Sequence, residues 1–180
     1  MSDDPGKSFL DRLRSSAAGA APTSGTALPG TACDAATPRE QLGAFRERIH
    51  YLLTRELKLA EVEWTEQRNL KFAVEDRYFQ FFFDEHEPCY ISMYGGLLGR
   101  FTDEGGRVRA LEAASTTTRD VKAAKVFLFQ HGDAWFAAAS IELVVPALDA
   151  VDKLFVKRML GLLRHGITDF AKRFAELGGS

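Results

Sequence analysis

The residues from Leu70 to Tyr94 carry the clearest hydrophobic pattern in the chain, because apolar side chains alternate with others in three successive runs. Alternation puts every second side chain on one face of a strand, and aromatic and β-branched residues suit a pleated surface. Residues 75–77 and 84–88 separate the runs and are short and charged, as hairpin connections often are. The pattern predicts a three-stranded antiparallel meander with one apolar face. The side chains on that face are Leu70, Phe72, Val74, Phe79, Phe81, Phe83, Cys89, Ile91 and Met93.

A helix is predicted before the meander, beginning at Thr37. Thr37, Pro38 and Glu40 form a capping box, in which the threonine hydroxyl and the glutamate carboxylate accept hydrogen bonds from otherwise unpaired amides. Apolar residues then recur every three or four positions as far as Leu57, so the helix is expected to reach about Leu59 and to cover the sheet. The alternation over residues 61–65 predicts one further short strand before the meander.

The C-terminal half predicts a short helix over 107–117, strands over 125–129 and 135–145, and a long final helix. Gly132 lies in the turn between the two strands, and Asp149 is the expected N-cap of the last helix. If one face of that helix packs on the sheet, the side chains of Phe155, Leu162 and Phe170 are buried there. The remaining apolar positions widen the stripe beyond what one sheet face needs, so they predict a homodimer contact or a surface for a client segment. These positions are Val156, Leu160, Leu163 and Ile167.

Residues 1–36 are predicted to form a disordered N-terminal tail, and residues 37–180 a single domain. From Ser15 to Ala36 the chain consists mostly of Ala, Gly, Ser, Thr and Pro, which bury too little apolar surface to offset the entropy of ordering. Within the tail, residues 8–14 contain Phe9, Leu10 and Leu13 at helical spacing. This segment forms either a transient helix or a docking peptide for a groove on this protein or another.

Composition narrows the classes of function. The chain has 180 residues, a formal net charge of −2 and 27% charged residues, which gives no general electrostatic reason to bind nucleic acid or an anionic membrane. Its two cysteines, Cys33 and Cys89, fall in the tail and in a strand, which favours reduced thiols. The chain begins acidic and contains no apolar run long enough to span a bilayer. We therefore expect a cytoplasmic protein with no membrane association.

The sequence contains no recognisable catalytic or cofactor motif. Residues 84–89 gather five potential metal ligands, Asp84, Glu85, His86, Glu87 and Cys89, but their spacing fits no standard zinc or calcium site, and a solvated turn is the preferred interpretation. The glycines at 95, 96 and 99 lack the Lys-Ser/Thr continuation of a phosphate loop. No catalytic residue, metal or cofactor is predicted.

The order of elements and two stretches of sequence resemble a known family. From about Thr37 to Leu177 the chain resembles YbjN-domain proteins, through the segment LEAASTTTRDVKAAKVFLF that starts at Leu111 and through the C-terminal hairpin followed by an amphipathic helix. The resemblance implies the fold of class I type III secretion chaperones: an α+β domain, often dimeric, that binds protein segments and carries no known catalytic residues.

We accordingly predict an α+β fold in which an antiparallel sheet of five or six strands packs against N-terminal and C-terminal helices. The predicted function is that of a non-enzymatic, chaperone-like module that binds a protein or peptide segment. Two alternatives stay open: an enzyme whose site is not visible in sequence, and an adaptor for acidic partners or nucleic acid that uses the basic flank of the last helix, with nucleic acid the less expected partner. That flank contains Lys153, Lys157, Arg158, Arg164, Lys172 and Arg173.

Overall fold

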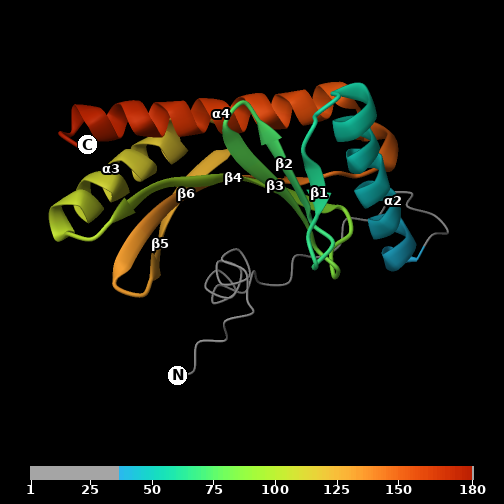
Figure 1. Ribbon diagram of the computed structural model, residues 1–180, viewed down its shortest axis with the longest axis horizontal. Coiled ribbons are helices and arrows are strands. Elements are labelled where there is room, and N and C mark those ends of the chain that lie inside the picture. Colours follow the sequence, from blue (N-terminus) through green and yellow to red (C-terminus); the bar gives the residue numbers. More distant parts are fainter. Residues whose placement is uncertain (1–36, 180) are drawn as a thin grey trace. The chain divides into compact units, whose positions relative to one another are not determined.

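The protein is an α+β domain built on one six-stranded antiparallel sheet. A computed structural model describes residues 37–179 (Figure 1), so the predictions for the tail over residues 1–36 lie outside the described residues. The strands lie in the order β1-β2-β3-β4-β6-β5. Their bounds are β1 (Val62–Trp64), β2 (Leu70–Val74), β3 (Arg77–Phe83), β4 (Tyr90–Phe101), β5 (Ala124–His131) and β6 (Ala134–Val144). The helices are α2 (Pro38–Tyr51), α3 (Glu104–Asp120) and α4 (Lys153–Glu176), with a π-helical turn η1 (Leu52–Glu56) after α2 and a 3-10 turn η2 (Leu148–Ala150) before α4.

The predicted meander is confirmed, including the assignment of its two faces. Phe81 pairs with Met93 across the β3–β4 ladder, and Phe82 pairs with Ser92 on the opposite face. Phe81 is completely buried, whereas Phe82 retains 7% of its surface. The order of exposure is as expected, but Phe82 is nearly buried too. The phenylalanines of β2 and β3 stack on one another on the core face, with ring centroids of Phe72 and Phe81 5.7 Å apart.

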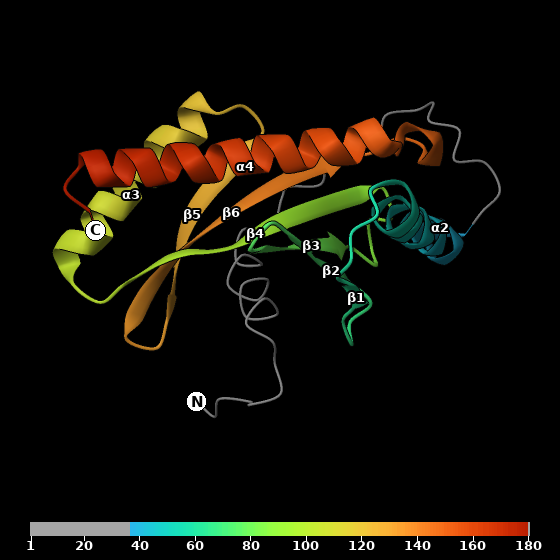
Figure 2. The ribbon, with the colours of Figure 1, turned by 45° about the horizontal axis from the view of Figure 1, so that its top comes forward.

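The described helices pack on the core face of the sheet, where Phe72, Phe81 and Ile141 point (Figures 1 and 2). α4 crosses β4, β5 and β6, while α2 packs its apolar side chains over the end of the sheet near Phe83. The capping box of α2 is confirmed, because the Thr37 amide donates to Glu40 over 2.7 Å and the Glu40 amide donates to the Thr37 hydroxyl over 3.3 Å.

Two helices begin at other residues than predicted, because their N-caps are Asp103 and Asp152. α3 begins at Glu104 rather than 107, since the Asp103 carboxylate accepts from the Gly106 amide over 2.8 Å and makes a start through two glycines possible. α4 begins at Lys153, and its N-cap is Asp152 instead of Asp149. The Phe155 amide donates to the Asp152 carboxylate over 2.6 Å. Asp149 lies in the preceding 3-10 turn.

The face that α4 presents to the sheet also differs from the prediction. Leu162, expected to be covered by the sheet, is 39% exposed, whereas Val156 and Leu163 are completely buried. Gly166 explains this rotation: a Cβ at Gly166 would lie only 2.7 Å from the Cβ of Ala124 on β5. The helix therefore turns its smallest residue toward β5, and the neighbouring positions along that stripe become core.

α3 and α4 are joined by a polar contact centred on Asp169. Its carboxylate accepts hydrogen bonds from the Thr117 hydroxyl over 2.9 Å and from Arg173 one turn along α4. The hydrogen bond from Arg173 lowers the pKa of Asp169, Thr117 lowers it further, and partial burial opposes both. Because the carboxylate is the favoured form in the folded protein, its contribution to stability is present above the pKa of the unfolded chain, about 3.9, and is lost as the pH falls through the lower folded pKa.

We expect Asp169→Asn to lower the free energy of unfolding by about 1–2 kcal/mol at pH 7. Hydrogen bonds to charged groups contribute about 1.5–3 kcal/mol, and partial exposure of this contact to solvent reduces that contribution. The difference from the unmodified protein should shrink as the pH falls below about 3.9 and through the lower pKa of the folded protein, because a protonated Asp169 is uncharged like asparagine. Urea denaturation across that range measures both effects. Asp133→Asn in the exposed β5–β6 turn is the control. A difference that stays constant with pH would mean that the Asp169 charge contributes nothing to stability.

Candidate functional site

The sheet opens at a fork between β3 and β4. β3 pairs with β4 only from Ile91 to Gly95, whereas β4 continues to Phe101 and pairs with β6 as far as that residue, with interruptions at Gly96 and Leu98. Register shifts between Gly95 and Leu97 and between Leu97 and Gly99 turn the second half of β4 away from β3. As a result, no described strand pairs with residues 96–101 on the side where β3 pairs with the first half of β4.

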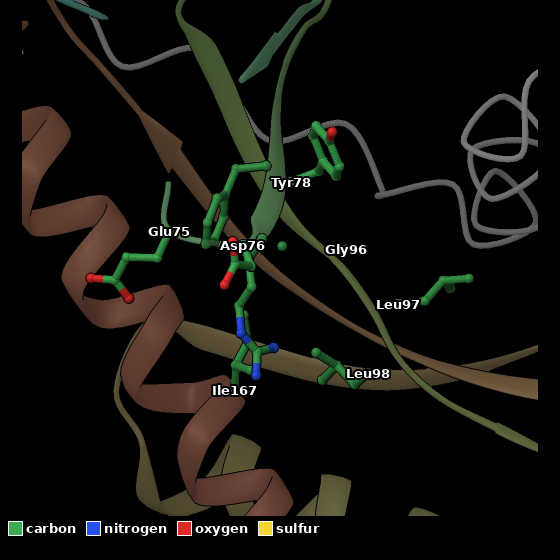
Figure 3. A pocket seen from close by; sticks show the side chains of 10 residues that line it. Glu75, Asp76, Tyr78, Gly96, Leu97, Leu98 and Ile167 are labelled. Atoms are coloured by element: carbon green, nitrogen blue, oxygen red, sulfur yellow. The ribbon is translucent and has the colours of Figure 1, made fainter. Parts of the chain in front are cut away.

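An open cleft of about 730 Å³ occupies this fork (Figure 3). The β2–β3 turn with Asp76 lies on one side and Leu97 and Leu98 of β4 on the other, while Ile167 reaches it from α4. Leu97 is 50% exposed and Tyr78 is 55% exposed, so two large apolar surfaces meet water here. The lining residues are Glu75, Asp76, Arg77, Tyr78, Phe79, Gly95, Gly96, Leu97, Leu98 and Ile167.

The turn that borders the cleft is held against α4 by an ion pair. Glu75 accepts from Arg164 of α4 over 2.6 Å, and its backbone has the unusual φ of +48°. This geometry lets the Arg77 amide donate to the Glu75 carbonyl and closes a very tight reversal between β2 and β3. The turn therefore keeps its position beside α4 instead of folding over the free part of β4.

Gly95 sets how closely α4 approaches the fork. A Cβ at this position would lie 2.6 Å from Cδ1 of Ile167 and 3.3 Å from the Phe79 ring. The absence of a side chain thus allows Ile167 to sit directly on β4 at the point where the two strands separate. Ile167 is only 4% exposed, so the base of the cleft is apolar and rigid.

A second hollow of about 380 Å³ adjoins the cleft and extends it along α4. The two hollows share Arg77, Leu98 and Ile167, and the second continues past Phe170 and Phe174. The Phe170 and Phe174 rings stack with centroids 6.0 Å apart. We call the two hollows together the fork groove: it runs beside the unpaired part of β4 toward the C-terminal end of α4.

Two exposed arginines, Arg77 and Arg100, line the fork groove. Within residues 37–179 neither of them forms an ion pair, in contrast to Arg164, which is neutralised by Glu75. Glu75 and Asp76 place negative charge only at the turn. The part of the groove beside β4 therefore combines apolar walls with uncompensated positive charge.

The four positions predicted as a protein-binding or dimer surface do not form an exposed patch. Val156 and Leu163 are completely buried and Ile167 nearly so, because the rotation of α4 turns them onto the sheet. Leu160 is half-buried and packs against the same core. Ile167 is the one member of the set that contributes to the candidate site, as part of the apolar base. The homodimer stays a prediction. The exposed apolar patch from which it was inferred is not present on α4.

The other candidates from sequence lie elsewhere. In the 84–89 connection Glu85 pairs with Arg46 over 3.7 Å, and the His86 amide donates to Asp84. Across residues 37–179 no three His, Cys, Asp or Glu side chains gather as a metal site would require. On the basic flank of α4, Arg164, Lys172 and Arg173 form ion pairs with acidic side chains.

Sequence reasoning missed the fork groove because its residues lie far apart in the chain. The glycine cluster at 95, 96 and 99 was the available signal, and the pairing register shows that it marks a bulged strand. Comparison of the sequence with protein-family models and with curated proteins gives no match. Among the described helices, none has the length and apolar character needed to cross a bilayer.

Proposed function

We propose that this protein is a binding module that holds a segment of another protein in the fork groove. The observation that carries the proposal is the shape and lining of the groove: two adjoining open hollows with an apolar base, the exposed Leu97, and two arginines that form no ion pair within the described residues. An elongated, open surface of mixed character suits a polypeptide chain, whereas small-molecule sites are usually enclosed on most sides. The resemblance to YbjN-domain proteins supports the same class of function.

The alternative of an adaptor that uses the basic flank of α4 has weaker support. Three of the six basic residues on that flank are engaged in ion pairs within the domain, which reduces the positive potential they offer to a partner. Lys157 and Arg158 remain exposed and lie toward the N-terminal half of α4. They serve better as a control surface than as a candidate site.

Site-specific photo-crosslinking tests the proposed function. We expect a photo-reactive side chain at Leu97 to give a discrete adduct with a cellular protein, and the same group at Val108 on α3, which is equally exposed, to give none. Adding Gly96→Trp should reduce the Leu97 adduct at least about fivefold, because Gly96 lines the cleft and an indole there fills it. A Cβ at Gly96 meets only the Tyr78 carbonyl, at 3.4 Å, so the strand tolerates the change. Equal adducts at both positions, or an adduct that persists after Gly96→Trp, would contradict the proposal.

A further inference from the structure

We infer that the segment bound in the fork groove is an extended strand that adds to the unpaired edge of β4, and that it carries acidic residues among apolar ones. This inference rests on the proposed function. It differs from docking onto an outer edge of the sheet, because the free edge lies inside the sheet, in line with β3.

The backbone of β4 selects an extended guest. Residues 96–101 remain in strand conformation, and four of them, Leu97, Gly99, Arg100 and Phe101, pair with β6 on one side. The side toward the groove therefore presents backbone groups with no partner strand in the described part of the chain. Such an edge is a template for another strand, since main-chain hydrogen bonds form only with an extended backbone. The six residues give room for a guest of about four to six residues, or roughly 20 Å at 3.3 Å per residue.

The two faces of the groove fix which side chains the guest needs. On the core face, Ile167, Phe170 and Phe174 of α4 line the groove, and Arg77 lies on the same face of β3 as Phe79. Guest residues that point this way are therefore apolar, except for an acidic one beside Arg77. The guest's other side chains alternate to the face that carries Leu97 and Arg100, which pair with Ala138 and Phe136 of β6. A single guest strand therefore meets apolar side chains and Arg77 on the α4 side, and Leu97 and Arg100 on the other side.

The two arginines of the groove determine which charge the guest must carry. Arg77 precedes the last paired position of β3 by two residues, and Arg100 lies near the end of β4. Both arginines line the second hollow, and Arg77 also lines the first. Both are exposed and form no ion pair with described residues. Carboxylates on the guest would neutralise them, whereas a basic guest would be repelled. A proline-containing guest is disfavoured because proline cannot donate to the ladder.

A phage library of random linear dodecapeptides, selected on the full chain, tests this inference. We expect enriched peptides that combine apolar and acidic residues and lack proline. The best peptide, synthesised with a fluorescent label, should lose about tenfold or more in affinity with Arg77→Glu plus Arg100→Glu, and little with the matched pair Lys157→Glu plus Arg158→Glu, which changes net charge equally. N-methylation of alternate peptide amides should also abolish binding, because it removes backbone donors but leaves every side chain in place.

The outcomes separate the inference from the proposed function. If peptides bind in the groove, with Gly96→Trp reducing the affinity, but N-methylation and both charge-reversal pairs leave it unchanged, strand addition is wrong and the proposed function stands. If the selection enriches no peptide above a protein-free control, both are wrong. Circular dichroism of each variant, with a far-ultraviolet spectrum and an unfolding midpoint like those of the unmodified protein, assigns the losses to binding. Peptide that crosslinks two copies of the chain edge to edge would identify self-association in place of a guest, and would also overturn the inference.

Discussion

Phe81→Ala is expected to lower the free energy of unfolding by about 3–5 kcal/mol, the usual cost of truncating a fully buried phenylalanine. Phe81 is completely buried between Leu70 of β2 and Met93 of β4, and its ring stacks on those of Phe72 and Phe83. Its removal leaves a cavity at the centre of the sheet's core face. Because small domains have only about 5–15 kcal/mol of stability in total, the variant should unfold at much lower denaturant.

Tyr78→Ala is the matched control for that substitution. Tyr78 also lies on β3 but is 55% exposed, and its principal contact is the Lys71 ammonium, 4.5 Å from the ring centre. Exposed contacts of this kind contribute about 0.5–1 kcal/mol, so the control should lose no more than that. Urea denaturation measures both variants. Equal losses would mean that the faces of β3 are assigned incorrectly.

Gly166→Val is expected to destabilise the protein by about 1–3 kcal/mol, the range for forcing extra atoms into a packed interface. A Cβ at Gly166 would lie 2.7 Å from the Ala124 Cβ, and that atom is fixed to the backbone of β5 and cannot move aside. α4 would have to lift from β5 to accommodate the valine. The same displacement would shift Ile167, so the fork groove should also change shape.

Gly161→Ala on the same helix should have the opposite effect. Gly161 is exposed, and a Cβ there meets nothing within 4 Å. Alanine then gains about 1 kcal/mol from helix propensity without a steric penalty. Thermal unfolding of the two glycine variants gives the comparison. A stabilised Gly166→Val variant would show that α4 does not pack as closely on β5 as described.

The elements formed by local signals could be predicted from the sequence. Alternation gave the meander and its faces, because a period of two admits only one buried face, and the capping box located the start of α2. The α+β class followed from the order of helices and strands. Errors arose where neighbouring residues of one type compete: Asp149 and Asp152 both suit an N-cap, and the contact of Phe155 with Asp152 decides between them.

Neither the rotation of α4 about its axis nor the fork groove could be predicted, because both depend on contacts between residues far apart in the chain. The apolar stripe of α4 is wider than one sheet face needs, so its amphipathic pattern does not specify which part of the stripe faces the sheet. The close contact between Gly166 and Ala124 decides it, and these residues are 42 positions apart. Likewise, the fork depends on the pairing of β4 with β6 beyond Gly95, a long-range register that the separate strand patterns do not encode.

The unpaired edge of β4 is the proposed receptor for an extended chain, and nuclear Overhauser effects measure a contact of this kind directly. With isotope-labelled protein and an unlabelled selected peptide, we predict cross-strand signals between backbone protons of the peptide and amide protons of residues 97–100. The same amides should exchange with solvent more slowly when the peptide is bound. Peptide signals confined to side chains of another surface, with the amides of residues 97–100 unaffected, would contradict the account.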